Sequence, residues 1–83
     1  MKIADAMQDA DFVQFDGTTF VAGYVRVPDE TTTADDIVVE GRAGEAEIEL
    51  TFDDVRDAAY IGEGVYRLRS GSLIRFLSGA TLH

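Results

Sequence analysis

The sequence predicts an α+β fold, in which a mostly antiparallel sheet of hairpins carries one short N-terminal helix and one helix between the fourth and fifth strands. Two observations lead to this class. Turn dipeptides such as Asp16-Gly17 separate short segments in which apolar and polar residues alternate. Two other segments carry apolar residues at helical spacing. The length of 83 residues and the hydrophobic content of 46% suit a single domain over residues 1–83.

The N-terminal third is predicted to form a helix followed by a hairpin. Apolar residues recur at helical spacing over residues 2–10. Residues 12–15 and 18–27 are predicted strands, because Asp16-Gly17 suits the positive φ angles of a type I′ turn. Strict alternation in the second strand would place Phe20 and Tyr24 on the same face.

A polar loop over residues 28–36 is predicted to lead into a second hairpin. Residues 37–40 form its first strand, residues 41–44 its loop, and residues 45–50 its second strand. In that last strand, Glu45, Glu47 and Glu49 are expected to face outward.

The C-terminal third is predicted to form a helix and a final hairpin. Thr51 is the expected N-cap, with Asp54 three residues later in the manner of a capping box. The helix should run to about residue 60 and end at the glycines at positions 62 and 64. Residues 65–69 and 73–77 should pair about Ser70-Gly71, and residues 79–83 should form a frayed tail.

Composition excludes several classes of site and partner. The chain has no cysteine, so it can form neither disulfides nor thiolate metal sites. Its N-terminus is too short and acidic for a secretory signal, and no apolar run could span a membrane. We therefore expect a cytoplasmic protein. With a pI near 4.2, it should bind neither nucleic acid nor a membrane surface directly.

The residues also offer little for catalysis. The single histidine is His83, and no serine has an evident base partner. No glycine-rich phosphate motif is present. The acids at positions 9, 11 and 16 lack the spacing of an EF-hand calcium loop. We expect no enzymatic activity, no cofactor and no metal site.

Charge is partitioned along the chain. All sixteen acidic residues lie between Asp5 and Glu63, so residues 1–63, with four cations, carry a net charge of −12. Residues 64–83 carry three arginines and no acid, for a net charge of +3. We expect Arg67, Arg69 and Arg75 to share one face of the last hairpin. There they either neutralise neighbouring acids or form a small basic contact patch.

Nine acids in three neighbouring segments are the candidate partner-binding residues. They are Asp35, Asp36, Glu40, Glu45, Glu47, Glu49, Asp53, Asp54 and Asp57. Each has an ordinary explanation, since the helix macrodipole favours acids in a first turn and glutamates keep strand surfaces soluble. As a group they repel one another, as do Asp5 and Asp9 in the first predicted helix.

The spacing of these acids points to mimicry of nucleic acid. Outward side chains on a strand repeat every 6.6–6.8 Å or so, which resembles the spacing of phosphates along a nucleic-acid strand. A row of this kind could fill a cationic groove built for DNA or RNA. Such binding should be fast, because it is electrostatically steered, and weakened by salt.

In its size, its acidity and its lack of cysteine and catalytic groups, the chain resembles the small phage-encoded inhibitors called anti-CRISPR proteins, several of which mimic DNA. The acid rows at positions 35–36, at positions 45, 47 and 49, and at positions 53, 54 and 57 carry this resemblance. It is a resemblance of character and includes no family motif. It implies a monomeric viral protein in the host cytoplasm, whose acidic face blocks the DNA-binding surface of a CRISPR-Cas effector subunit.

Two other interpretations stay open. The chain could be a structural or assembly subunit of a virion or complex, which uses its sheet edge and the arginine hairpin. It could instead be a salt-adapted domain, whose acidity only serves solubility. A mimic should bind a basic protein at low salt and an assembly subunit should form oligomers, whereas a salt-adapted domain should unfold in dilute buffer.

Overall fold

The computed structural model describes residues 2–79 and contains a seven-stranded antiparallel sheet with two short helices. The elements are α1 (Ile3–Met7), β1 (Phe12–Phe15), β2 (Thr18–Val25), β3 (Ile37–Ala43), β4 (Ala46–Thr51), α2 (Phe52–Val55), β5 (Ala59–Gly62), β6 (Val65–Arg67) and β7 (Leu73–Leu77). The strands lie in the order β4-β3-β2-β1-β7-β6-β5. The predicted α+β class is confirmed.

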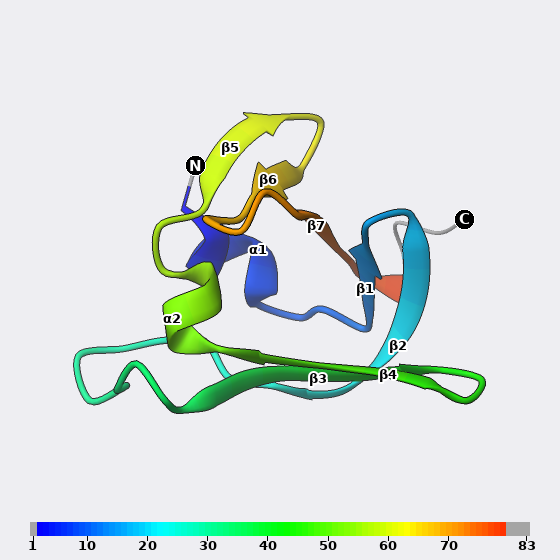
Figure 1. The fold of residues 1–83 in the computed structure, drawn as a ribbon, viewed down its shortest axis with the longest axis horizontal. Helices are drawn as coiled ribbons and strands as arrows, with labels where there is room; N and C mark the ends of the chain where they lie inside the picture. The colour runs from blue at the N-terminus through cyan, green and yellow to red at the C-terminus, as the bar shows by residue number, and fades with distance from the viewer. Residues whose placement is uncertain (1, 80–83) are drawn as a thin grey trace.

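The sheet curls around the first helix. In Figure 1, α1 lies between a lower layer that contains β3 and β4 and an upper layer that contains β5 and β6, and β2 rises along the right side from the lower layer. Ile3 and Met7 of α1 join the buried core, and the Tyr66 hydroxyl donates a hydrogen bond of 3.2 Å to the Lys2 carbonyl. The remaining core residues come from the strands, α2 and the segment after β6: Val13, Val38, Val39, Leu50, Val55, Tyr66, Leu68 and Ile74.

The hairpin turns predicted from Asp-Gly and Ser-Gly are confirmed. Asp16 and Gly17 have φ angles of 46° and 89°, as a type I′ turn requires. The Asp16 side chain also accepts a hydrogen bond of 2.8 Å from the backbone N–H of Leu73, which joins this turn to β7. Gly71 has a φ angle of 97° in the turn before β7.

A β-bulge in β2 overturns the predicted faces of that strand. The register with β3 shifts between Ala22 and Tyr24, so Gly23 is an extra residue. Phe20 and Ala22 therefore face the core, whereas Tyr24 stands on the outer face opposite Glu40 and is 44% exposed. Strict alternation fails here because an inserted residue inverts the parity of everything after it.

The second hairpin turns later than predicted. β3 continues to Ala43, and the turn consists of Gly44, with a φ angle of 62°, and Glu45. Glu45 consequently lies in the turn and is not an outward residue of β4. Gly41 remains in β3, where an added Cβ would lie 3.0 Å from the Phe20 Cβ, so a larger residue would clash with the core.

Both helices are shorter than predicted. Asp9 has a φ angle of 58° beyond the end of α1, so Asp5 and Asp9 do not form a helical pair. After α2, residues 59–62 form β5 instead of a longer helix. Pairing with β6 decides this, because it places Tyr60 against Tyr66 with ring centroids 5.2 Å apart. The glycines at positions 62 and 64 belong to the β5–β6 turn region and do not end a helix.

The start of α2 agrees with the predicted capping box, whereas the first residue of the predicted frayed tail is held in place. The Asp54 carboxylate accepts hydrogen bonds from the Thr51 backbone N–H and hydroxyl, at 2.9 and 3.1 Å, as the capping box predicted. Gly79 donates a bond of 2.7 Å to the Asp11 carboxylate, so the predicted fraying does not begin there. The rest of the predicted tail, including His83, lies outside the described residues. None of the helices over residues 2–79 has the length and apolar character needed to cross a membrane.

Candidate functional site

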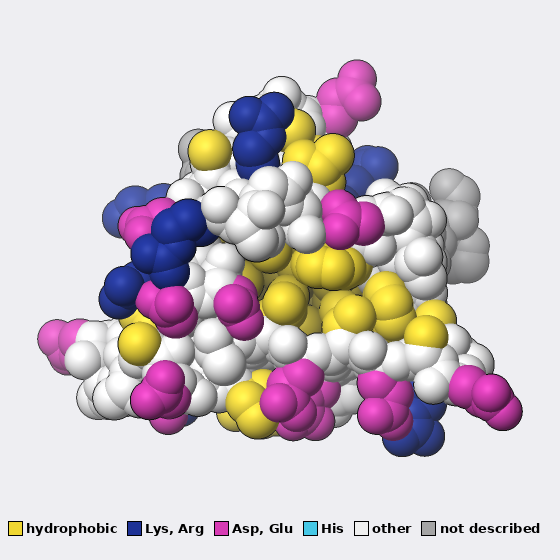
Figure 2. Space-filling model, in the orientation of Figure 1, with side chains coloured by type: hydrophobic (Ala, Val, Ile, Leu, Met, Phe, Trp, Pro, Cys, Tyr) yellow, Lys and Arg dark blue, Asp and Glu magenta, His cyan; other side chains and the backbone are white. Residues whose placement is uncertain are grey.

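Part of the predicted acid group comes together on the outer face of β2, β3 and β4. Two rows of cross-strand neighbours make up this face: Val21–Arg42–Glu47 and Tyr24–Glu40–Glu49. All six residues are exposed. We call Glu40, Glu47 and Glu49 together the glutamate face. In Figure 2, acidic side chains follow one another along the lower margin, where Figure 1 draws β3 and β4.

Two members of the glutamate face confront each other without compensation. Glu40 on β3 is directly opposite Glu49 on β4. Neither forms an ion pair with any residue in the described range 2–79. Like charges at directly opposite positions of an antiparallel pair destabilise the sheet. This pair is therefore a source of repulsion that folding has to overcome.

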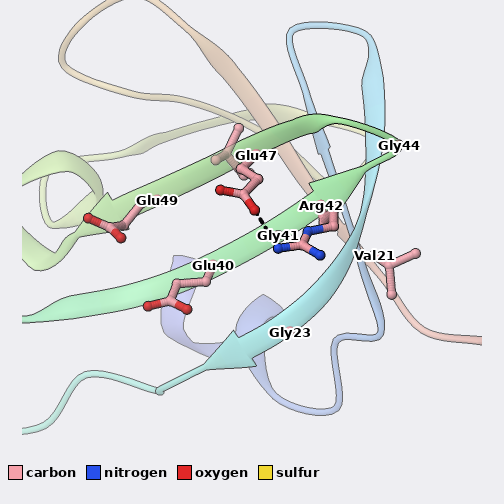
Figure 3. A pocket seen from close by; sticks show the side chains of 9 residues that line it. Val21, Gly23, Glu40, Gly41, Arg42, Gly44, Glu47 and Glu49 are labelled. Atoms are coloured by element: carbon pink, nitrogen blue, oxygen red, sulfur yellow. Dashed lines mark hydrogen bonds and ion pairs between the residues drawn. The ribbon is translucent and has the colours of Figure 1, made fainter.

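The third member of the glutamate face has a partner. Arg42 donates a short hydrogen bond to the Glu47 carboxylate directly across the ladder, as Figure 3 shows. The side chains of Arg42 and Glu47 remain 71% and 61% exposed. An ion pair this accessible to water contributes little, on the order of 0–1 kcal/mol. A stronger cationic partner could therefore compete for Glu47.

The glutamate face borders an open hollow with a volume of about 800 Å³. Three of its lining residues are glycines, and Figure 3 shows the carboxylates of Glu40 and Glu49 beside the Arg42–Glu47 pair. The lining residues are Val21, Gly23, Glu40, Gly41, Arg42, Gly44, Glu47, Ile48 and Glu49. They include no histidine, serine, threonine or lysine, so the hollow lacks the usual nucleophiles and bases, apart from carboxylates. Its chemistry suits the binding of cationic side chains.

The acids of α2 and the residues after it are neutralised within the fold. Asp53 forms ion pairs of 2.8 Å with Arg69 and 2.9 Å with Arg56, and Asp57 lies 3.6 Å from Arg69. Arg69 also donates a hydrogen bond of 3.0 Å to the Asp53 carbonyl. Its hydrogen bond to Asp53 and the nearby carboxylates raise the pKa of Arg69. Asp54 accepts the hydrogen bonds that cap α2. The predicted site residues Asp53, Asp54 and Asp57 are therefore all engaged in contacts within the fold.

The two acids before β3 differ from each other. Asp36 accepts a bond of 2.9 Å from the Thr33 backbone N–H and pairs with Arg26 at 3.3 Å. The Thr33 hydrogen bonds and the Arg26 charge lower the pKa of Asp36. Asp35 is exposed in the same loop. Neither acid lies on the two cross-strand rows that contain the glutamate face.

The arginines of the C-terminal segment do not act as one group. Arg67 and Arg75 share the outer face of β6 and β7, opposite Leu73 and Val65 respectively. Arg69 follows β6 and turns to the acids near α2 instead. The expectation of one face for all three is therefore wrong. The chain leaves the strand at Leu68, whose N–H bonds to the Ser72 carbonyl at 2.8 Å, so alternation no longer governs Arg69.

Sequence reasoning missed the neighbours of the glutamate face. Val21, Tyr24 and Arg42 border it; the bulge at Gly23 placed Tyr24 there, and the later turn kept Arg42 in β3. The only available signal was Gly23, because a glycine inside a strand often marks a bulge.

The described residues offer no metal site, and the chain matches no known protein in the comparisons made. Over residues 2–79, no three His, Cys, Asp or Glu side chains are grouped so that they could hold a metal ion. Comparisons of the chain with protein-family models, with curated proteins and with solved structures found no match.

Proposed function

We propose that this chain is a non-enzymatic acidic binding protein, which blocks a nucleic-acid-binding protein by occupying its cationic surface. The unpaired confrontation of Glu40 with Glu49 carries this proposal. Both positions are exposed, so the fold would accept neutral or oppositely charged side chains there. A cationic groove would relieve the repulsion, so binding would recover free energy that folding gives up.

The shape of the glutamate face supports mimicry of a phosphate strand. Glu47 and Glu49 are two positions apart on β4, so they are separated by roughly 6.6–6.8 Å along the strand. Glu40 lies opposite Glu49 on the adjacent strand, whose backbone is about 4.7–4.9 Å away. Arginine or lysine side chains that normally hold phosphates can hold carboxylates through charge-assisted hydrogen bonds. The partner class implied by the resemblance, a CRISPR-Cas effector subunit, is the first partner to test.

The contact surface that we propose is narrower than the nine predicted acids. It consists of the glutamate face and the adjoining turn residue Glu45. The acids at positions 36, 53, 54 and 57 hold the loop before β3 and the region around α2 through contacts within the chain. Their charges are partly cancelled, so they contribute less to the external field.

A pull-down from nuclease-treated lysate tests this function. The unchanged protein should retain a basic nucleic-acid-binding protein at low salt and release it at high salt, because exposed charges are screened. The variant Glu40→Gln/Glu49→Gln should lose it. The control Glu30→Gln/Glu63→Gln removes the same charge from two exposed acids elsewhere and should retain it. Equal loss by both variants would reduce the effect to net charge and overturn the proposal.

An assembly role is the second candidate. Arg67 is exposed, forms no ion pair within the described residues and shares an outer face with Arg75. This face could meet an acidic surface in a complex. Light scattering should then show oligomers that Arg67→Gln/Arg75→Gln dissolves, whereas the inhibitor proposal expects a monomer.

A further inference from the structure

The sheet ends in two free edges. β4 and β5 are the terminal strands of the order β4-β3-β2-β1-β7-β6-β5, and no ladder joins them to each other. A terminal strand presents backbone N–H and C=O groups that can pair with another strand. The two edges differ in regularity and in charge, and these differences decide what each can bind.

The hydrogen-bond parity of β4 identifies its outward-facing backbone groups. The turn before β4 has two residues, so the flanking pair Ala43–Ala46 bonds to each other, and every second pair does likewise. The backbone groups of Ile48 therefore face β3, while those of Glu47 and Glu49 face the free edge. The bond of 2.8 Å from the Arg26 N–H to the Val38 carbonyl agrees, because it places Val38 toward β2 and its neighbour Val39 toward β4.

β4 is the more regular of the two edges. Its register with β3 runs without interruption from Ala46 to Leu50. β5 has only four residues, and its register with β6 shifts between Tyr60 and Gly62. A bulge bends and twists a strand, which makes addition of a further strand harder.

The side chains of β4 select the chemistry of an added strand. Glu47 and Glu49 stand on the outer face, and Ile48, on the opposite face, is only partly buried. A second copy that used the same edge would bring glutamates against glutamates, which is unfavourable. A strand that alternates basic with apolar residues would place cations beside Glu47 and Glu49, and an apolar side chain beside Ile48.

We propose that the free edge of β4 binds an extended segment of the partner, in which lysine or arginine alternates with apolar residues, as an additional strand of the sheet. This inference rests on the proposed function for the basic character of the partner. It adds the mode of recognition: main-chain pairing with Glu47 and Glu49 gives register, and the two carboxylates give specificity.

Peptide binding to the intact chain tests main-chain pairing. The probe is a short synthetic peptide of alternating lysine and valine, and its affinity is measured by calorimetry at low salt. A second peptide has the same sequence but is N-methylated at its lysines, so it lacks the backbone donors that an antiparallel added strand would turn toward Glu47 and Glu49. A third has the same composition with its lysines in one block. We expect both altered peptides to bind at least about tenfold more weakly, because they lose backbone hydrogen bonds or alternation.

A matched pair of variants tests the same idea from the side of the protein. Glu49→Gln removes the charge and keeps the N–H, whereas Glu49→Pro removes both without breaking a bond to β3. Proline should weaken binding of the alternating peptide about tenfold more than glutamine does. The N-methylated peptide covers the case in which Glu49→Pro fails to fold. If the N-methylated peptide binds the unchanged protein as tightly as the unmethylated peptide does, the proposal of strand addition is overturned. Salt-sensitive capture of a basic protein would still support the proposed function in that case.

Discussion

Glu40 and Glu49 lie directly opposite each other on β3 and β4, and neither is paired with a cation anywhere in residues 2–79. This confrontation differs from the environment of Asp53 and Asp57 near α2, which are held by arginines. The fold therefore separates acids that stabilise it from acids that it merely tolerates.

Removing one charge of the confronting pair should stabilise the fold. We expect Glu40→Gln to raise the free energy of unfolding by about 0.2–1 kcal/mol at low salt, because it removes a like-charge cross-strand contact. Thermal or urea unfolding measures this gain. Glu30→Gln is the control at an exposed loop position, and its effect should stay within about 0.5 kcal/mol. A loss of stability in Glu40→Gln would mean that Glu40 has a favourable contact in the folded state.

Partner binding should depend on the position of the acid and not on its charge alone. Asp57→Asn removes an acid that Arg69 already neutralises at 3.6 Å, so captured partner should remain near the unchanged level. Glu49→Gln removes an uncompensated acid, and capture at low salt should fall several-fold. Both variants change the net charge equally, and pull-down yields compare them directly. Equal losses would contradict the assignment of the acids near α2 to structural contacts.

Any side chain at position 41 should lower the free energy of unfolding. An added Cβ would approach the Phe20 Cβ to 3.0 Å and the Val21 carbonyl oxygen to 3.3 Å, so we expect Gly41→Ala to destabilise the fold by about 1–3 kcal/mol. The matched control is Gly23→Ala in the neighbouring strand, where the nearest atom to an added Cβ is 3.8 Å away. Urea unfolding should give a clearly larger loss for Gly41→Ala. Similar losses would point to the general effect of replacing glycine in a strand.

The loop before β3 should loosen in acid. The Thr33 hydrogen bonds and Arg26 lower the pKa of Asp36 below its ordinary value of 3.8. A lowered folded-state pKa means that the contribution of Asp36 is complete above its unfolded-state pKa and disappears as pH falls through the folded-state value. An NMR titration of the Asp36 carboxyl carbon should show a midpoint below 3.8, with the Thr33 amide shift following it. A midpoint above 3.8 would contradict the hydrogen-bonded arrangement.

The chain should remain folded in dilute buffer. The core contains no buried charged or polar side chain within the described residues, and several of the acids already have arginine partners. Circular dichroism at low and high salt checks this expectation. Unfolding on removal of salt would instead favour the salt-adapted domain, since such a protein needs cations to screen its acids.

The sequence by itself determined the features that neighbouring residues decide. Asp16-Gly17 specified a tight turn because the two positions need positive φ angles, and Asp54 lies within reach of the Thr51 backbone for capping. The α+β class followed from the same local patterns of turns and alternation.

Only the tertiary structure decided which acids stay uncompensated and which strands are free. The extra residue at Gly23 reverses the faces of β2, residues 59–62 become a strand because β6 pairs with them, and Arg69 reaches Asp53 across sixteen positions of sequence. Each of these outcomes depends on which segments meet in the folded chain and, within the sheet, on the register in which they pair. A local pattern cannot supply that register, since a shift of one residue moves every later side chain to the other face of the sheet.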